Sequence, residues 1–207
     1  MATDKQKAME LKKVKTPEFR LSFPALYKPK SFEQQEAKYS CVMLFDKTKA
    51  DLTGMKKAVV AAATEKWGAK EKWPKGMKTP FRDGDEKEDM DGYKGHTFVS
   101  ASSKQAPQIV DYKGPGVRPE PIPETDNRCY AGCYARATLI AFAYDKAGNR
   151  GVSFSLQNVQ VLRDGKPFSG RKNAEDEFSD DLVVENNDAE NPDNYEESSN
   201  DDSDLGL

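Results

Sequence analysis

The sequence contains one histidine, three cysteines and no catalytic motif, and each scarcity excludes a class of protein. With His96 as the only imidazole, Ser-His-Asp or Cys-His catalysis would rest on this residue alone, and no nucleophile stands beside it. Cys41, Cys129 and Cys133 lack the spacing of a disulfide or zinc framework, so we expect reduced thiols and no bound metal. The phosphate-binding, dinucleotide-binding, metalloprotease and nucleophile-elbow motifs are all missing. The composition therefore predicts a protein that is not an enzyme, has no catalytic residues and needs no cofactor.

Long apolar runs are also missing. No segment approaches the roughly 18 consecutive apolar residues that a membrane span requires. The first five residues, Met1 to Lys5, do not begin an apolar signal segment. We therefore expect a soluble cytoplasmic protein without membrane contact.

Basic residues are absent from the end of the chain, and this asymmetry is the most informative feature of the composition. All 32 Lys and Arg residues lie at or before Lys172, whereas 14 of the 35 acidic residues follow it. Residues 1–172 thus carry 32 minus 21, or +11, and residues 173–207 carry −14. A basic body attracts polyanions, and an acidic tail resembles one.

Composition divides the chain into three segments. Residues 1–16 are rich in lysine and poor in large apolar groups, which predicts a basic N-terminal arm, either mobile or a short frayed helix. Residues 17–172 hold the apolar periodicities of one folded domain. Residues 173–207 are acidic and rich in Asn and Ser, so we expect a disordered tail.

Apolar periodicity predicts mostly strands in the central segment. Alternation over 19–23 indicates a strand that Pro24 and Pro29 limit to an edge position or a short length. A helix is predicted between 52 and 67, because Leu52, Met55 and Val59 recur at helical spacing and Gly68 ends the pattern. The residues between 69 and 95 form a long connection. The other predicted strands are 39–45, 97–101, 108–112, 132–144 and 151–162, the last two joined as a hairpin.

These elements predict a mainly β fold, an OB-fold-like small, partly open β-barrel with one inserted helix. The OB-fold is the small barrel whose strands and loops bind oligonucleotides. Its helix usually follows the third strand, whereas the helix predicted here follows the second. The core of this barrel is expected to contain five phenylalanines, Phe19, Phe23, Phe45, Phe142 and Phe154.

The basic segment also holds 18 of the 20 aromatic residues, the combination that single-stranded nucleic acid requires. On the late strand, Tyr134 and Arg136 share one face, so they are the first candidates for a base contact and a phosphate contact. Tyr134 has a structural alternative as a core or rim tyrosine, and Arg136, as a charge in mid-strand, must be either solvated or paired. Further candidates lie in loops where basic and aromatic residues interleave: Tyr27, Lys28, Lys30, Lys104, Tyr112, Lys113, Arg118, Arg128 and Tyr130.

One acidic cluster leaves a different function open. Asp83, Asp85, Glu88 and Asp89 lie between residues 82 and 91, and clustered carboxylates hold the metals of some nucleases. Nuclease ligands normally come from separate strands, so a solvated turn is the favoured interpretation. A metal-dependent nuclease, an RNA-binding chaperone and a scaffolding protein therefore remain the alternatives to a DNA-binding protein.

Several segments together resemble a family of bacteriophage single-stranded DNA-binding proteins, formerly known as a domain of unknown function. The likeness extends over roughly residues 14–180. It is carried by Thr16 to Leu26, Arg82 to Asp85, Ala101 to Lys104, Tyr130 to Tyr134, Gly148 to Val152 and Val159 to Gly165. The resemblance implies an OB-fold that coats single-stranded DNA without sequence preference during phage replication, recombination or repair, in the host cytoplasm.

The resemblance also implies a role for the tail. In such proteins the acidic tail contacts replication or recombination proteins, which are the partners expected here besides single-stranded DNA. Related tails end on Phe, whereas this chain ends on Leu207. The tail is further expected to compete with DNA for the basic body. Whether the protein is a monomer or a dimer is left open by the sequence.

Overall fold

The computed structural model describes residues 4–31, 36–87, 89–146 and 148–168. Within them are two α helices, α1 (Asp4–Lys12) and α2 (Thr53–Trp67). The eight strands are β1 (Lys13–Lys15), β2 (Phe19–Lys30), β3 (Lys38–Asp46), β4 (Arg82–Asp83), β5 (His96–Ser103), β6 (Gln108–Val110), β7 (Tyr134–Lys146) and β8 (Asn149–Arg163). Neither helix is both long enough and apolar enough to cross a membrane. The predicted acidic tail, 173–207, lies outside the described residues.

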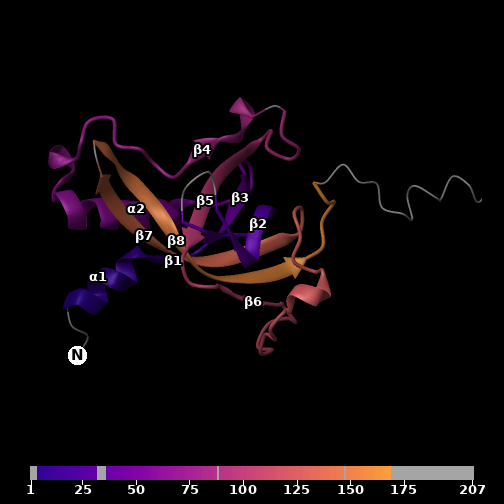
Figure 1. Cartoon of the computed structure of the whole chain (residues 1–207). Coiled ribbons are helices and arrows are strands. Elements are labelled where there is room, and N and C mark those ends of the chain that lie inside the picture. The colour runs from indigo at the N-terminus through magenta and orange to yellow at the C-terminus, as the bar shows by residue number, and fades with distance from the viewer. Residues whose placement is uncertain (1–3, 32–35, 88, 147, 169–207) are drawn as a thin grey trace, which may run out of the picture. The chain divides into compact units, whose positions relative to one another are not determined.

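Five of the strands pair in a closed ring, in the order β7–β2–β3–β5–β8 and back to β7 (Figure 1). All neighbours in the ring are antiparallel except β5 and β8. If the five ring strands are numbered by their order in the chain, starting from β2, their order around the ring is 1-2-3-5-4. This mainly β, OB-fold-like arrangement confirms the predicted fold class. The helix α2 follows the second ring strand, as the sequence indicated, and it contacts β7 and β1.

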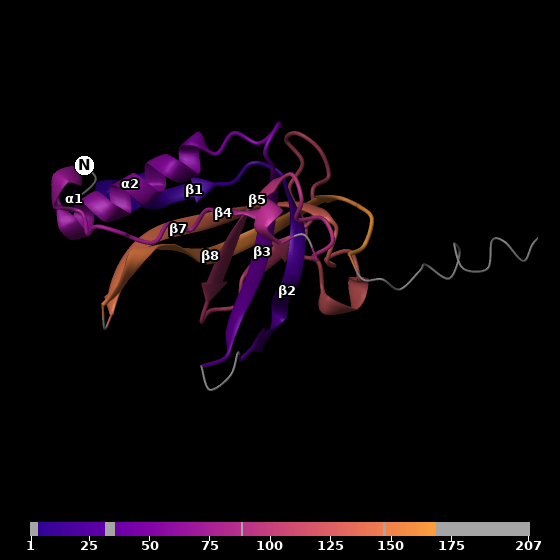
Figure 2. The ribbon, with the colours of Figure 1, turned by 90° about the horizontal axis from the view of Figure 1, so that it is seen from above.

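The N-terminal segment contains regular structure. Residues 4–12 form α1, which is the short-helix alternative for the predicted arm, and β1 pairs with β7. Lys12 bonds Glu65 of α2 at 2.6 Å. Both helices lie beside β1 and β7 and leave β2 and β3 uncovered (Figure 2).

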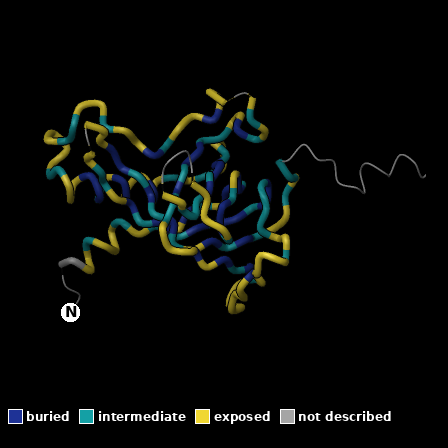
Figure 3. Tube along the Cα trace, viewed as in Figure 1, coloured by how far each residue is buried: buried dark blue, intermediate teal, exposed yellow. Residues whose placement is uncertain are grey.

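The core lies inside the ring (Figure 3). On β7 alternate residues are buried, whereas β2, β3 and β5 also bury consecutive residues. On β7 the buried positions are Ala135, Ala137, Leu139 and Ala141, and these mostly small side chains leave room for α2. Phe19 and Phe45 meet edge-to-face with ring centroids 5.6 Å apart, and Phe154 is equally buried. These three phenylalanines confirm their predicted place in the core.

The other two predicted core phenylalanines are on the surface, so that prediction was wrong for them. Phe142 is 45% exposed because it belongs to the outer face of β7. Phe23 is 60% exposed because the pairing of β2 with β3 shifts register between Ser22 and Ala25. At this bulge Phe23 has a φ of 45°, a strained conformation for a bulky residue that costs on the order of 1–3 kcal/mol.

The predicted restriction of the first strand was also wrong. β2 runs for 12 residues through Pro24 and Pro29 instead of ending at them. Both prolines lie where the β2–β3 pairing is irregular, between Ser22 and Lys30. A proline lacks the N–H of a regular ladder but is tolerated at a bulge.

Two threonines with buried hydroxyl oxygens provide a matched test of this packing. Thr16 Oγ1 accepts a hydrogen bond from the N–H of Ala137 at 2.9 Å, whereas Thr138 Oγ1 is buried without a partner among the described residues. Thr16→Val is expected to lower the free energy of unfolding by about 1–3 kcal/mol, because the Ala137 N–H loses its acceptor. Thr138→Val should be neutral or stabilising. Urea unfolding measures both, and equal losses in the two variants would contradict the assignment.

Candidate nucleic-acid interface

Four of the predicted cations already have carboxylate partners. The pairs are Lys28 with Glu124 at 2.8 Å, Lys104 with Glu36 at 2.6 Å, Lys113 with Glu120 at 2.5 Å and Arg128 with Asp126 at 2.6 Å. A phosphate would have to compete with these carboxylates for each cation, so the pairs weaken the residues as phosphate ligands. Among the described residues, Lys30, Arg118 and Arg136 have no carboxylate partner.

Two predicted tyrosines are tied to backbone by their hydroxyls. Tyr27 donates to the carbonyl of Ile122 at 3.0 Å, and burial raises its pKa to about 12. Tyr130 donates to the carbonyl of Gly165 at 2.8 Å and accepts from the N–H of the same residue at 3.0 Å. Both rings therefore fix loops to the ring of strands.

The structure brings Arg136 together with Tyr112. The guanidinium lies 5.5 Å from the centre of the Tyr112 ring and donates to Gln160 Oε1 at 2.8 Å. Its ring and amide partners leave the positive charge of Arg136 uncompensated. Tyr112 is 42% exposed, so this pair remains a candidate contact on the outer side of β7.

Tyr134 belongs to a stack of cations and aromatic rings. The Arg163 guanidinium lies 3.4 Å from the centre of its ring and that of Arg20 lies 5.5 Å from it. Arg20 also lies 4.2 Å from the ring of Phe168. Tyr134 shares the half-buried face of β7 with Arg136, as predicted, but the guanidiniums around it restrict access to its ring.

A continuous surface of small hydroxyl side chains crosses the outer side of the ring. Cross-strand partners point to the same side of a sheet, and the alternate residues of these strands are buried. Ser40 of β3 pairs with Ser102 of β5, which pairs with Ser155 of β8. We call this surface the serine face, and its members are Ser40, Ser100, Ser102, Ser153 and Ser155. On the same side of the sheet, Ser22 is buried and Val42 packs against the cluster that contains Tyr93.

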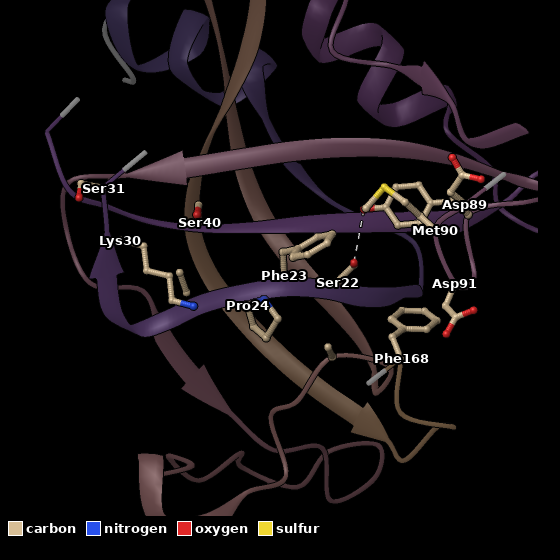
Figure 4. A pocket seen from close by; sticks show the side chains of 13 residues that line it. Ser22, Phe23, Pro24, Lys30, Ser31, Ser40, Asp89, Met90, Asp91 and Phe168 are labelled. Carbon is tan, nitrogen blue, oxygen red and sulfur yellow. Dashed lines mark hydrogen bonds between the residues drawn. The ribbon is translucent and has the colours of Figure 1, made fainter. Parts of the chain in front are cut away.

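One end of the serine face opens into a hollow of about 820 Å³ around the exposed ring of Phe23 (Figure 4). Lys30 and the segment with Asp89 and Asp91 lie at opposite ends of this hollow, with Phe23 between them. Phe168 forms part of the wall beside Asp91. We call it the Phe23 hollow.

The other end of the serine face contains a second hollow of about 480 Å³. Lys78, Arg82 and Tyr144 line it together with Ser100 and Ser153, and no carboxylate does. The backbone places Lys78 there: its N–H donates to the carbonyl of Arg150 and its carbonyl accepts from Val152, both at 3.0 Å. Neither Lys78 nor Arg82 has a carboxylate partner in the described part of the chain. We call it the basic hollow.

The loop from Gly84 to Gly95 packs on the outer side of β3 and β5. Tyr93 is buried against Phe98, with ring centroids 5.3 Å apart. The Lys47 ammonium bonds Asp83 at 2.5 Å and Asp85 at 2.6 Å, and these bonds hold the pKa of both carboxyls below the usual range. Two carboxylates of the predicted acidic cluster thus brace the loop, and Glu88 lies outside the described residues.

Comparison with known sequences shows the family of this chain. The family model described as "Enterobacter phage Enc34, ssDNA-binding protein" matches residues 12–191. The chain belongs to this family. It is 38% identical over 181 residues to "Putative protein p50" of Acyrthosiphon pisum secondary endosymbiont phage 1, covering 83% of this chain and 95% of that protein.

Two solved structures share the fold of this chain. The single-stranded DNA-binding protein from bacteriophage Enc34 in complex with ssDNA matches with a TM-score of 0.63 and 21% identity, over 76% of this chain and 89% of that chain. The protein gp2.5 of bacteriophage T7, a single-stranded DNA-binding protein, matches with a TM-score of 0.53 and 16% identity, over 87% and 99%.

Sequence reasoning missed the residues that border the serine face. Phe23 and Phe142 were placed in the core, and Lys78 and Arg82 were left within a long connection. One signal pointed to Phe23, because it is followed by Pro24 and a proline in a strand indicates a bulge. Nothing in the local sequence placed Lys78 beside β8.

Proposed function

We propose that the protein binds single-stranded DNA of any sequence along the serine face. The observation that carries the proposal is the combination at its two ends: an exposed phenyl ring at Phe23, and two cations, Lys78 and Arg82, that have no carboxylate partner among the described residues. The family and the OB-like fold support the proposal, because the family model and the matching phage Enc34 structure are both described as single-stranded DNA-binding proteins.

The chemistry of the face suits an unpaired strand. Cations bind phosphates and release counterions, and an aromatic face stacks on a base of any identity. The serine side chains between the two hollows are small, so a strand can approach the sheet closely and find hydroxyl partners. A duplex keeps its bases stacked inside and offers Phe23 nothing to stack on.

The biological role follows from such binding. The protein would coat exposed strands during phage DNA replication, recombination or repair, remove their secondary structure and protect them from nucleases, in the cytoplasm of the host cell. The −14 charge of residues 173–207 would compete with DNA for the basic body. A tail released by DNA would then recruit replication or recombination proteins.

Equilibrium binding of labelled oligonucleotides tests the proposal. A single strand should bind at least about fivefold more tightly than the duplex of the same sequence, the lower limit for one stacked base. Its log-log salt slope should be near −0.7 for each phosphate neutralised. Equal affinity for duplex, or binding that does not depend on salt, would refute it. Preference for RNA of the same sequence would favour the RNA-binding alternative, and cleavage products formed with Mg²⁺ would favour the nuclease.

A further inference from the structure

The Phe23 hollow combines features that a general phosphate-binding surface does not need. Two carboxylates, Asp89 and Asp91, line a cavity at the end of a surface that is proposed to bind a polyanion. The ion pairs of the same loop involve Asp83 and Asp85, and Asp89 and Asp91 remain exposed. Carboxylates repel phosphates, so a base fits beside them better than a phosphate does.

The wall that carries these carboxylates is anchored on the sheet. Tyr93 is buried, and its hydroxyl lies 3.4 Å from Ser22 Oγ, in hydrogen-bond contact. Phe168, which forms another part of the wall, donates its N–H to the carbonyl of Ala131 at 3.0 Å and stacks on Arg20. The cavity is therefore preformed between two fixed elements.

Phe23 supplies the platform. Its ring is 60% exposed at a strained bulge, although a residue without a side chain would satisfy the backbone there without strain. An aromatic ring held in this way is available to stack on a base. Lys30, at the end of the hollow away from Asp89 and Asp91, is placed to hold the phosphate that follows.

We propose that the Phe23 hollow is a base-binding subsite with a preference for bases that carry an exocyclic amine. Asp89 and Asp91 can only accept hydrogen bonds, and the amino groups of cytosine, adenine and guanine donate them. Thymine has no amino group, and its single N3–H donor lies between two carbonyl oxygens, which the carboxylates repel. The subsite thus rests on the proposed single-strand binding and adds a local preference to it.

The test compares cytosine and thymine oligonucleotides of about 16 nucleotides, the upper limit for one OB-fold. The full-length protein should bind the cytosine oligomer at least about fivefold more tightly, the lower limit for a direct base contact. The double variant Asp89→Asn, Asp91→Asn should bind the thymine oligomer more tightly than wild type does, because two repulsive charges are removed. Its preference for cytosine should be lost.

Phe23→Ala should weaken binding of both oligomers roughly 5- to 150-fold, and Phe23→Tyr should retain it, because stacking needs only an aromatic ring. Val60→Ala on α2 is the control, since it truncates another half-exposed apolar side chain. A wild-type protein that binds neither oligomer would refute single-strand binding itself. Wild-type binding with no preference, a preference kept by the double Asn variant, or full binding by Phe23→Ala would overturn the subsite alone.

Discussion

Replacing both cations of the basic hollow is expected to weaken single-strand binding roughly 60-fold at about 0.05 M salt. Each phosphate contact raises the affinity by a factor of about the molar salt concentration to the power −0.7, which is near eightfold at 0.05 M. The factors for two contacts multiply. The variant Lys78→Gln, Arg82→Gln keeps the first carbons of each side-chain stem and removes the Arg82 guanidinium, which lies 5.0 Å from the centre of the Phe98 ring. Its log-log salt slope should be smaller by about 1.4. Fluorescence anisotropy titrations at several salt concentrations measure both quantities.

A matched control distinguishes the effect of where the removed charges lie from the effect of how many charges are removed. Lys28→Gln, Lys113→Gln removes the same two charges, but these ammonium groups are already paired with Glu124 and Glu120. It should change the affinity far less. If this control lost as much affinity as the Lys78 and Arg82 variant, the loops predicted from sequence would be the phosphate track and the basic hollow would not.

Removing residues 173–207 is expected to tighten single-strand binding about tenfold at low salt. A tethered competitor can reach an effective concentration of about 1 mM, and nonspecific binding near 10⁻⁴ M then lowers the apparent affinity about tenfold. The tail begins five residues after Phe168, which lines the Phe23 hollow, so the tether is short. Higher salt should reduce the gain, because added ions screen the tail as they screen DNA.

A variant of unchanged length distinguishes charge from bulk in this experiment. Changing the tail's Asp and Glu residues to Asn and Gln should reproduce the gain of the truncation. A truncated protein that binds no more tightly than the full chain would refute competition by the tail. A gain with the truncation but not with the neutral tail would show that the tail obstructs DNA by its size.

Local patterns in the sequence predicted most of the secondary structure. The hairpin of β7 and β8 and the helix α2 follow from apolar spacing, because each element buries one side on the same core. The closure of the ring was harder to predict from the sequence, because Phe19 pairs with Ala135, which is more than half of the chain away. Tertiary packing of this kind leaves little local signal.

The candidate site was less predictable than the fold for the same reason. Arg136 could be identified because a charge in mid-strand must be solvated or paired. Lys78 and Arg82 lie in a connection whose path is set by hydrogen bonds to β8 and by pairing with β5. Phe23 faces outward only because the strand bulges, and a regular alternation would have buried it.

Photo-crosslinking tests most directly whether single-stranded DNA lies along the serine face. The full-length protein would be irradiated with oligonucleotides that carry 5-iodocytosine at successive positions, and crosslinked peptides would be identified by mass spectrometry. We predict crosslinks to Phe23 in one hollow and to Tyr144 in the other. Crosslinks confined to the loop 111–130, or to α1 and α2, would contradict the account.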